Sequence, residues 1–583
     1  MRHSMHRKLF FMIVMPVALM MAFAFRFIEY RNTYKNPFQK SISFSKIKYA
    51  IRCGLPAEDS SLLNIPPLPG WGNYKWKITT GSDSAQFYFD QGINMYYAFH
   101  TLESQASFNK AIQFDSVCAM AWYGKALSLG PTINYGNGYR APGNAWEAAM
   151  QSKKYDGKCT DIEKGLIHAI SIRYSSDTNA NLKSLRLKYA DAMQQLAFAY
   201  PHHADVITLY ADALMLEHPW DLYDKNLEPK PWTPQIRAIL NQALTIAPLH
   251  PGANHFMVHT LEGSLHPEDA LKNAETLADL MPDVAHIVHM PSHIYIRTGN
   301  YTKGIEANNQ AVAGYYKYMN LYQPVVNNAL LYQIHAEHLK FNCALDAGSY
   351  SIAMQTSDTL RHLISPEYLA AQGPLGSFLQ YAWFSSMFTQ IRFGKWEAIL
   401  QEPRMDSLPY AVVLLHFGRG MAFGHLNRIP EAENELKLLR ETMQIKSLKE
   451  PADPFSSAFD ACLIAENILR GLLAEKQFQD SKAIGFYQKA VVAEDNLVYN
   501  EPRDWLLPAR QYLGNLLLKT GDYKKAVKVF KKDLVINPLN GWSLTGLKIA
   551  YAAKNDTSSL KNLKVELSTA WQIKDIAVSS PVF

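Results

Sequence analysis

The stretch HIYIRTGNYTKGIEANNQAV, residues 293–312, decides the fold. A short apolar helix leads to a turn at Gly299 and Tyr301, after which a second helix follows. The same plan recurs in LLLKTGDYKKAVKVFKKDLVINP (516–538) and, with departures, at 101–126, 343–354 and 480–495. Because one pair of helices cannot bury its apolar faces alone, the recurrence predicts an all-α array of stacked units.

The unit resembles the tetratricopeptide repeat, a helix–turn–helix of 34 residues that ends near a proline, here Pro248, Pro282 and Pro538. About eight to ten repeats fit between residues 83 and 560, some broken by insertions. The resemblance implies an α-solenoid, a superhelix whose concave groove is lined by the first helix of each unit. A chain of 583 residues, 48% hydrophobic and 19% charged, is also too long for one compact core.

The N-terminus has the pattern of an export signal. A basic start precedes the apolar run LFFMIVMPVALMMAFA (9–24), which ends in the small residues Ala22 and Ala24. We therefore expect residues 1–25 to be a signal peptide or, if uncleaved, a membrane anchor. The rest of the chain would be exported, either free in the periplasm or anchored and facing it.

The chain divides at changes in composition. We expect five segments in chain order: the signal or anchor at 1–25, a linker or irregular segment at 26–82, N-terminal repeats at 83–250 with a Pro/Trp-rich insertion at 217–234, histidine-rich central repeats at 251–355, and C-terminal repeats at 356–583.

The charge distribution argues against a nucleic-acid-binding protein, and the cysteine spacing argues against a disulfide-stabilised one. Residues 1–52 contain ten Lys or Arg and one acid, so a net charge of +6 leaves about −3 for the remainder, and we expect no nucleic-acid partner. The five cysteines lie far apart without a C-x-x-C, which predicts small core residues and no disulfide framework.

Two histidine pairs recur at the repeat interval. HFMVHTLEG (255–263) and HMPSHIYIR (289–297) each hold histidines four residues apart, and corresponding members are separated by 34 residues. Residues three, four and seven apart share a helix face. With the repeat phase, this places eight metal-binding side chains on one groove face of three consecutive first helices: His255, His259, Glu262, His286, His289, His293, His335 and His338.

Histidines at i and i+4 can chelate one ion, and packed helices about 8–10 Å apart could share one ion or hold two. Nitrogen ligands suit copper, zinc or iron. Because Pro291 is suited to a first helical turn, we expect the helix to begin near His289 and His286 to leave the common face. Two alternatives stay open: a histidine-rich groove that binds a peptide or small molecule, and histidines with a structural role only.

Several stretches resemble a family of exported bacterial tetratricopeptide-repeat proteins that has no activity we can name. The resemblance covers most of residues 83–550 and is most specific in the paired H-x-x-x-H blocks. Where the family leads us to expect a third block beginning H-N-x-H, this chain has His335-Ala336-Glu337-His338. The matching stretches are HPGANHFMVHTLEGSLHPEDAL (250–271), PDVAHIVHMPSHIYIRTGNY (282–301), AMAWYGKALSLGPTINYG (119–136), DALMLEHPWDLYDK (212–225) and YNEPRDWLLPARQYLGNLLLKTG with DLVINPLNGWSLTGL (499–547).

Other segments could complete a pocket over the groove. The insertion at 217–234, which contains Trp220, is either a lid next to the first histidine helix or a packed cap. The stretch YNEPRDWLLPAR (499–510) offers Glu501, Trp505 and Arg510 for substrate binding if the superhelix nearly closes. Asp205 and Asp212 are candidate acceptors for imidazole N–H groups.

Two functional hypotheses follow. The first is a metal-dependent oxidoreductase in which His255, His259, His289, His293 and His338 bind one or two ions and act on a small-molecule or peptide ligand in the groove. The second is an exported repeat scaffold that binds a peptide or protein partner without catalysis. Since the chain has no H-E-x-x-H, G-x-S-x-G, Walker A or G-x-G-x-x-G motif, it identifies no catalytic residue.

Overall fold

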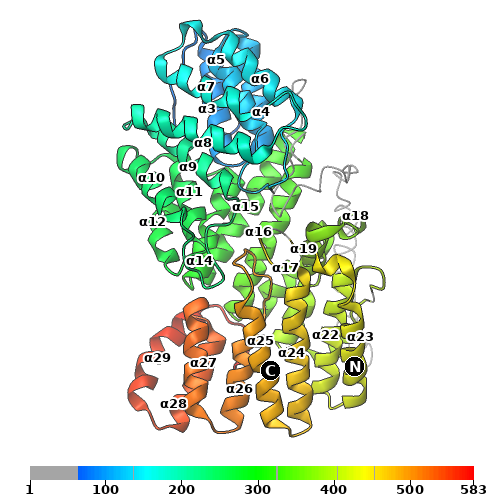
Figure 1. The fold of residues 1–583 in the computed structure, drawn as a ribbon. Helices are drawn as coiled ribbons and strands as arrows, with labels where there is room; N and C mark the ends of the chain where they lie inside the picture. The colour runs from blue at the N-terminus through cyan, green and yellow to red at the C-terminus, as the bar shows by residue number, and fades with distance from the viewer. Residues whose placement is uncertain (1–63, 136, 324–325, 404, 452–453) are drawn as a thin grey trace, which may run out of the picture. The chain divides into compact units, whose positions relative to one another are not determined.

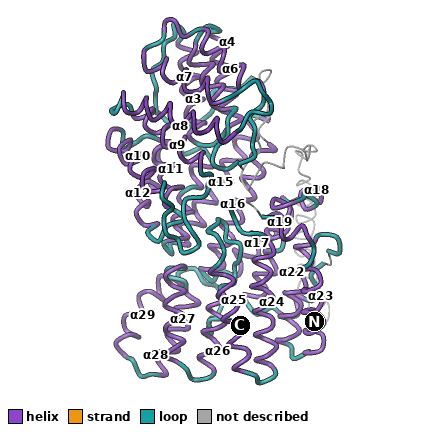
Figure 2. The backbone as a smooth tube through the Cα atoms, in the orientation of Figure 1, coloured by secondary structure: helices purple, strands orange, loops and turns teal. Residues whose placement is uncertain are grey.

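The computed structural model describes residues 64–135, 137–323, 326–403, 405–451 and 454–583. The proposed signal or anchor at 1–25 and Cys53 lie outside these residues. Within them the chain is helical, and isolated bridges such as the one between Tyr223 and Pro229 take the place of strands there (Figures 1 and 2). The helices of this part are α3 (Asp83–Tyr97), α4 (Thr101–Phe114), α5 (Ala119–Ser128), α6 (Gly143–Lys154), η1 (Asp156–Lys158), α7 (Asp161–Arg173), α8 (Leu182–Ala199), α9 (Ala204–Glu217), α10 (Thr233–Ile246), α11 (Pro251–Leu261), η2 (Pro267–Ala270), α12 (Leu271–Leu280), α13 (Ala285–His289), α14 (Pro291–Arg297), α15 (Tyr301–Leu321), α16 (Val326–Asp346), α17 (Tyr350–Leu363), α18 (Pro366–Leu369), α19 (Gly373–Trp383), α20 (Ser385–Arg392), α21 (Trp396–Ile399), α22 (Pro409–His425), α23 (Ile429–Thr442), η4 (Lys446–Lys449), α24 (Ala458–Lys476), α25 (Asp480–Asp495), α26 (Ala509–Lys519), α27 (Tyr523–Ile536), α28 (Gly541–Ala553) and α29 (Thr557–Ala570).

Two kinds of helix contact build the array. Consecutive helices pack as pairs, such as α15 with α16 and α26 with α27. Alternate helices also touch, so that α9 contacts α11, α14 contacts α16, and α26 contacts α28. This is the helical-repeat solenoid that the sequence predicts, in which each unit buries its apolar faces against its neighbours.

Small residues allow the close approach of the helices. Phe530 of α27 lies between Gly514 of α26 and Gly546 of α28, and a Cβ atom on either glycine would fall 2.3–2.4 Å from its ring. The turn glycine of the same unit, Gly521, has a φ of +78°, a conformation that side-chain-bearing residues rarely adopt. Backbone geometry thus requires the turn glycine, and packing requires the two helix glycines.

The first described helix returns to a later part of the chain. At its C-terminal end, Tyr96 donates a hydrogen bond to Asp212 (2.7 Å) and Tyr97 donates one to Asp205 (2.8 Å). Both acceptors lie on α9, and α3 also contacts α11. This return places the carbonyl group of Tyr97 and the ring of Phe99 against the histidine-bearing helix α11.

The Pro/Trp-rich insertion connects α9 to α10. Trp232 donates its indole N–H to the carbonyl group of Asp221 (2.6 Å) and stacks on His218 with ring centroids 3.7 Å apart. Tyr223 donates its hydroxyl to the carbonyl group of Thr260 on α11 (2.7 Å). The insertion is therefore folded on itself and fastened to the first histidine helix.

None of the helices in the described part of the chain combines the length and apolar character needed to cross a membrane. Cys118, Cys159, Cys343 and Cys462 are buried free thiols.

Candidate metal centre

Three helical segments carry the histidines. On α11, the imidazole of His250 caps the first turn by accepting from the Ala253 N–H (3.1 Å), and Pro251 occupies the first turn, where its missing N–H costs nothing. His255 and His259 follow on the next turns. The second segment is α13 with α14, and the third is α16.

The expectation that the second segment begins near His289 is wrong. The helix begins at Ala285, and Met290 keeps α-helical angles between α13 and α14 (φ −52°, ψ −37°). Pro291 removes one backbone donor, but Met290 still donates to the carbonyl group of His286 (3.0 Å). His286 therefore stays on the face shared by His289 and His293.

The first group, which we call triad 1, consists of His255, His259 and His286. One nitrogen from each ring lies within 4.8 Å of the others. The ring centroids of His255 and His259 are 4.7 Å apart, and those of His255 and His286 are 5.1 Å apart. All three side chains are buried.

The second group, triad 2, consists of His289, His293 and His335. One nitrogen from each of these rings also lies within 4.8 Å of the others. The Nε2 atom of His293 lies 2.8 Å from Nε2 of His289 and 3.5 Å from Nε2 of His335. Two nitrogens that bind one tetrahedral zinc ion at 2.0–2.1 Å lie about 3.3–3.4 Å apart, so small side-chain shifts would suit this group to an ion.

Backbone and amide acceptors fix two of the rings. The Nδ1 atom of His255 lies 2.6 Å from the carbonyl oxygen of Tyr97, and Nδ1 of His289 lies 2.6 Å from Oδ1 of Asn308. The Asn308 amide is oriented by its own N–H bond to the carbonyl group of Gly304 (2.8 Å), so Oδ1 faces His289. Because these oxygens only accept, both Nδ1 atoms donate and both Nε2 atoms carry the lone pair that binds metals.

A carboxylate fixes two more rings. Oε1 of Glu262 lies 2.8 Å from Nδ1 of His259, and Oε2 lies 2.6 Å from Nδ1 of His293. The sequence predicts that Glu262 binds a metal ion directly. In the structure, both of its carboxylate oxygens contact imidazole nitrogens. It lies just after α11, where Arg297 donates to its backbone carbonyl group (3.2 Å).

The electrostatics favour neutral imidazoles in triad 1. Burial, reinforced by neighbouring histidines, holds the pKa of His255 and His286 well below the usual range. In triad 2, burial holds the pKa of His289 low in the same way. His293 differs: burial opposes its charged form, but the Glu262 carboxylate outweighs burial and raises the pKa of His293. Neutral imidazole is the form that binds a metal ion.

Aromatic side chains enclose the triads. The ring of Phe99 stacks on His259 with centroids 5.6 Å apart, and Tyr332 meets His286 edge-on at 4.9 Å. Trp220, from the insertion, meets His259 edge-on at 5.2 Å. Phe99 and Trp220 have φ angles of +58° and +61°, a strained conformation for bulky residues.

A cavity of about 730 Å³ lies on the other side of the insertion. Pro219 and Asp221 line it, together with Arg186 of α8 and Val498. Trp220 lies between Pro219 and Asp221 in the chain and turns its ring to His259. Residues of the insertion thus line this cavity, and Trp220 between them contacts triad 1.

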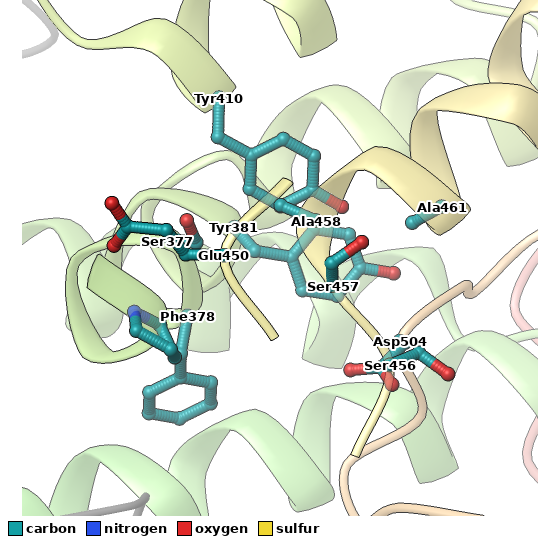
Figure 3. A pocket seen from close by; sticks show the side chains of 11 residues that line it. Ser377, Phe378, Tyr381, Tyr410, Glu450, Ser456, Ser457, Ala458, Ala461 and Asp504 are labelled. Carbon is teal, nitrogen blue, oxygen red and sulfur yellow. The ribbon is translucent and has the colours of Figure 1, made fainter. Parts of the chain in front are cut away.

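His338 does not belong to either triad. It lies three residues after His335 on α16, and its ring packs near Phe341, Phe378 and Tyr381 at centroid distances of 5.5–6.1 Å. Phe378 and Tyr381 line a separate small pocket of about 30 Å³ (Figure 3). Neither histidine triad includes His338, so its role as a metal ligand stays a prediction.

Of the four residues expected to bind substrate, two lie near the triads and two have other partners. Trp220 reaches triad 1, and the buried Glu501 carboxylate is near enough to help raise the pKa of His293. Trp505 instead packs edge-on against Phe388 and Phe417 in the core. Arg510 pairs with Asp495 (2.6 Å).

The two aspartates expected to hold imidazoles do not contact either triad. Asp205 accepts from Tyr74 and Tyr97 and lies 3.2 Å from Nε2 of His250, while Asp212 accepts from Tyr96. The groups that do hold the rings include Tyr97 and Asn308. No local motif marks them, although Asn308 follows His289 by 19 residues within one helix–turn–helix unit.

Comparison with known sequences identifies one repeat. A profile of the tetratricopeptide repeat matches residues 508–537, which cover α26 and α27. This chain contains a tetratricopeptide repeat. No curated protein sequence matches the chain.

Two solved structures are similar to this chain at low identity and low TM-score. A human IFIT1 dimer with m7Gppp-AAAA has 15% sequence identity and a TM-score of 0.29, with coverage of 86% of this chain and 92% of that chain. Yeast Tom70 has 11% identity and a TM-score of 0.27, with coverage of 85% and 93%. With identities and TM-scores this low, the ligands of those proteins carry no argument for this chain.

Proposed function

We propose that the protein binds two transition-metal ions, one at each histidine triad. The observation that carries the proposal is the convergence of three Nε2 atoms in triad 2, with Nδ1 of His289 and His293 already held by oxygen acceptors. Two lone pairs directed at each other across 2.8 Å repel unless a proton or a metal ion lies between them. Six imidazole ligands suit copper, zinc or iron and disfavour magnesium and calcium.

The adjacency of the triads supports redox chemistry as the activity. The rings of His259 and His293 have centroids 6.1 Å apart, and those of His286 and His289 are 5.9 Å apart. Two redox-active ions bound this close together could exchange two electrons with one substrate. The protein supplies oriented imidazoles, aromatic walls that limit water, and an insertion next to a cavity large enough for a small organic substrate.

A repeat scaffold that grips a peptide through these histidines has less support. Tetratricopeptide architecture provides a scaffold, but the seven side chains of the triads and Glu262 are at most 3% exposed. A peptide could reach them only after Trp220 and Phe99 moved away. Burial therefore favours an ion over a macromolecular ligand at this face.

We further propose that the protein works outside the cytoplasm, because of the basic start and apolar run of residues 1–25 and the resemblance to an exported family. Thiol-free ligation is compatible with an oxidising compartment. Fractionation of expressing cells tests this proposal: recovery in the periplasm or on the periplasmic face of the membrane supports it, and recovery in the cytoplasm alone contradicts it.

Metal analysis tests the principal proposal. We expect two equivalents of copper, zinc or iron in the untagged full chain, and none in the double variant His259→Ala/His293→Ala, which removes one ligand from each triad. Circular dichroism checks that the variant keeps its helices. A chain that binds no metal, either as purified or after reconstitution, contradicts the proposal and redirects the search to peptide partners.

A further inference from the structure

One side chain joins the two triads. Glu262 places Oε1 2.8 Å from Nδ1 of His259 in triad 1 and Oε2 2.6 Å from Nδ1 of His293 in triad 2. The carboxyl group is 1% exposed, so no solvent replaces these contacts. Each remaining acceptor described above serves a single triad, since Tyr97 holds only His255 and Asn308 holds only His289.

The charge of Glu262 decides what these contacts do. Both oxygens of the carboxyl group lie within 2.6–2.8 Å of an imidazole Nδ1 atom, the distance of a charge-assisted hydrogen bond. An ionised carboxylate has two accepting oxygens and no donor. Each imidazole it contacts must therefore present a protonated Nδ1, which leaves the lone pair on Nε2.

We propose that Glu262 is a shared positioning residue, which sets the tautomer of one ligand in each triad and thereby makes binding of the two ions interdependent. This inference rests on the proposed two-ion function. It explains why the chain buries a carboxylate between two histidine groups instead of giving each its own neutral acceptor. Partners of this kind in the outer shell of metal sites are worth about 10–100-fold in metal affinity.

Replacement by glutamine separates the shape of the side chain from its ability to accept with both oxygens. In Glu262→Gln the group keeps its shape, but one oxygen becomes an NH₂ donor. One imidazole keeps its acceptor, while the other faces a donor and must move its proton to Nε2, where it blocks the metal ligand. We expect the number of tightly bound ions to fall from two to one, with affinity at the impaired triad lowered about 10–100-fold.

A matched control is available on α16. Glu337 is also buried, at 3% exposed, and lies between His335 and His338 in the chain. Its carboxylate pairs with Lys340 (3.1 Å). Glu337→Gln should therefore keep both ions, although it changes a buried glutamate in the same way.

The experiment is a titration of the full-length metal-free protein with Zn²⁺ in competition with a chromophoric chelator, with helical content and Tm measured in parallel. One tight site in Glu262→Gln and two in Glu337→Gln support the inference. Two sites of unchanged affinity in Glu262→Gln overturn it and leave the proposed function intact. A wild-type protein without any zinc site, and with none for copper or iron, overturns the proposed function itself.

A second variant covers the case in which Glu262→Gln does not fold. Glu262→Asp keeps the charge and both oxygens but is one methylene shorter, so it cannot reach His259 and His293 together. We again expect one tight site. Retention of two sites at wild-type affinity would show that bridging is not required and would overturn the inference.

Discussion

The central repeats and the C-terminal repeat bury polar groups for different ends. In the C-terminal repeat, the Asp533 carboxylate accepts from Ser543 (2.5 Å), Gln511 (3.2 Å) and Asn537 (2.9 Å). Gln511 also donates to Asn540 (3.1 Å). These polar groups satisfy one another, as buried groups do when their role is to hold helices together.

In the central repeats, hydrogen bonds hold one nitrogen of several histidine rings, and in two of these rings they leave the other nitrogen without a partner in the described part of the chain. Tyr97, Asn308 and Oε1 of Glu262 hydrogen-bond the Nδ1 atoms of His255, His289 and His259, but Nε2 of His255 and His259 has no hydrogen-bond partner among the described residues. The same helix–turn–helix unit thus supports two outcomes. Closed polar networks indicate structure, whereas oriented groups that keep buried lone pairs indicate a ligand.

The largest expected effect is the loss of metal binding in the central repeats. His255→Ala/His289→Ala removes a ligand from each triad and should lower the metal content from two ions to none, with affinity reduced by several orders of magnitude. Elemental analysis after dialysis measures it. Retention of two ions would mean that the imidazoles are structural, and partner binding without metal would then favour the scaffold hypothesis.

A substitution in the C-terminal repeat should lower the folding stability without affecting metal binding in the central repeats. Asp533→Ala removes the acceptor of the buried donors Ser543 and Asn537 and one of the two acceptors of Gln511, which costs about 3–5 kcal/mol of folding free energy. Urea denaturation followed by circular dichroism gives this value. Metal content should not change, and a loss of metal in the folded variant would contradict the division between the regions.

Acid should reveal the buried charge of the central region. The folded-state pKa of Glu262, about 2, lies below its ordinary value of 4.5, so its contribution to stability is present above pH 4.5 and disappears as pH falls toward 2. This contribution is on the order of 3 kcal/mol. Metal-free wild type should lose stability more steeply than Glu262→Gln over that range, and equal slopes would show that the carboxylate is not ionised.

The smallest effect concerns the histidine placed outside both triads. His338→Ala should leave the ion count at two and change affinity by less than about threefold, because its ring packs near Phe378 and Tyr381. The same zinc titration provides the measurement. Loss of an ion would return His338 to the ligand set.

The fold was predictable because its signal is local and repeated. The Gly-x-Tyr turn needs a left-handed glycine, and Gly299 and Gly521 have φ angles of +75° and +78°. Helix spacing likewise placed His255 beside His259 and His289 beside His293. Periodicity could not decide which face His286 takes, because the effect of Pro291 depends on packing around the helix.

The partners of the histidines could not be predicted. Tyr97 lies 158 residues from His255 in the sequence and meets it only because α3 returns to α9 and α11. His335 and His338 differ by less than one helical turn, so spacing alone assigned both to the groove. Spacing could not predict the contacts of Trp505 and Arg510 either, since a polar or aromatic residue near a repeat boundary can serve the core equally well.

Trp220 gives the molecule its own optical reporter. Its indole meets His259 edge-on with centroids 5.2 Å apart, so a paramagnetic ion such as Cu²⁺ in triad 1 would quench its emission by contact-range electron or energy transfer. The chain has ten other tryptophans, and the difference between wild type and Trp220→Phe isolates the signal. The arrival of an ion at one triad could then be timed separately from the filling of the other.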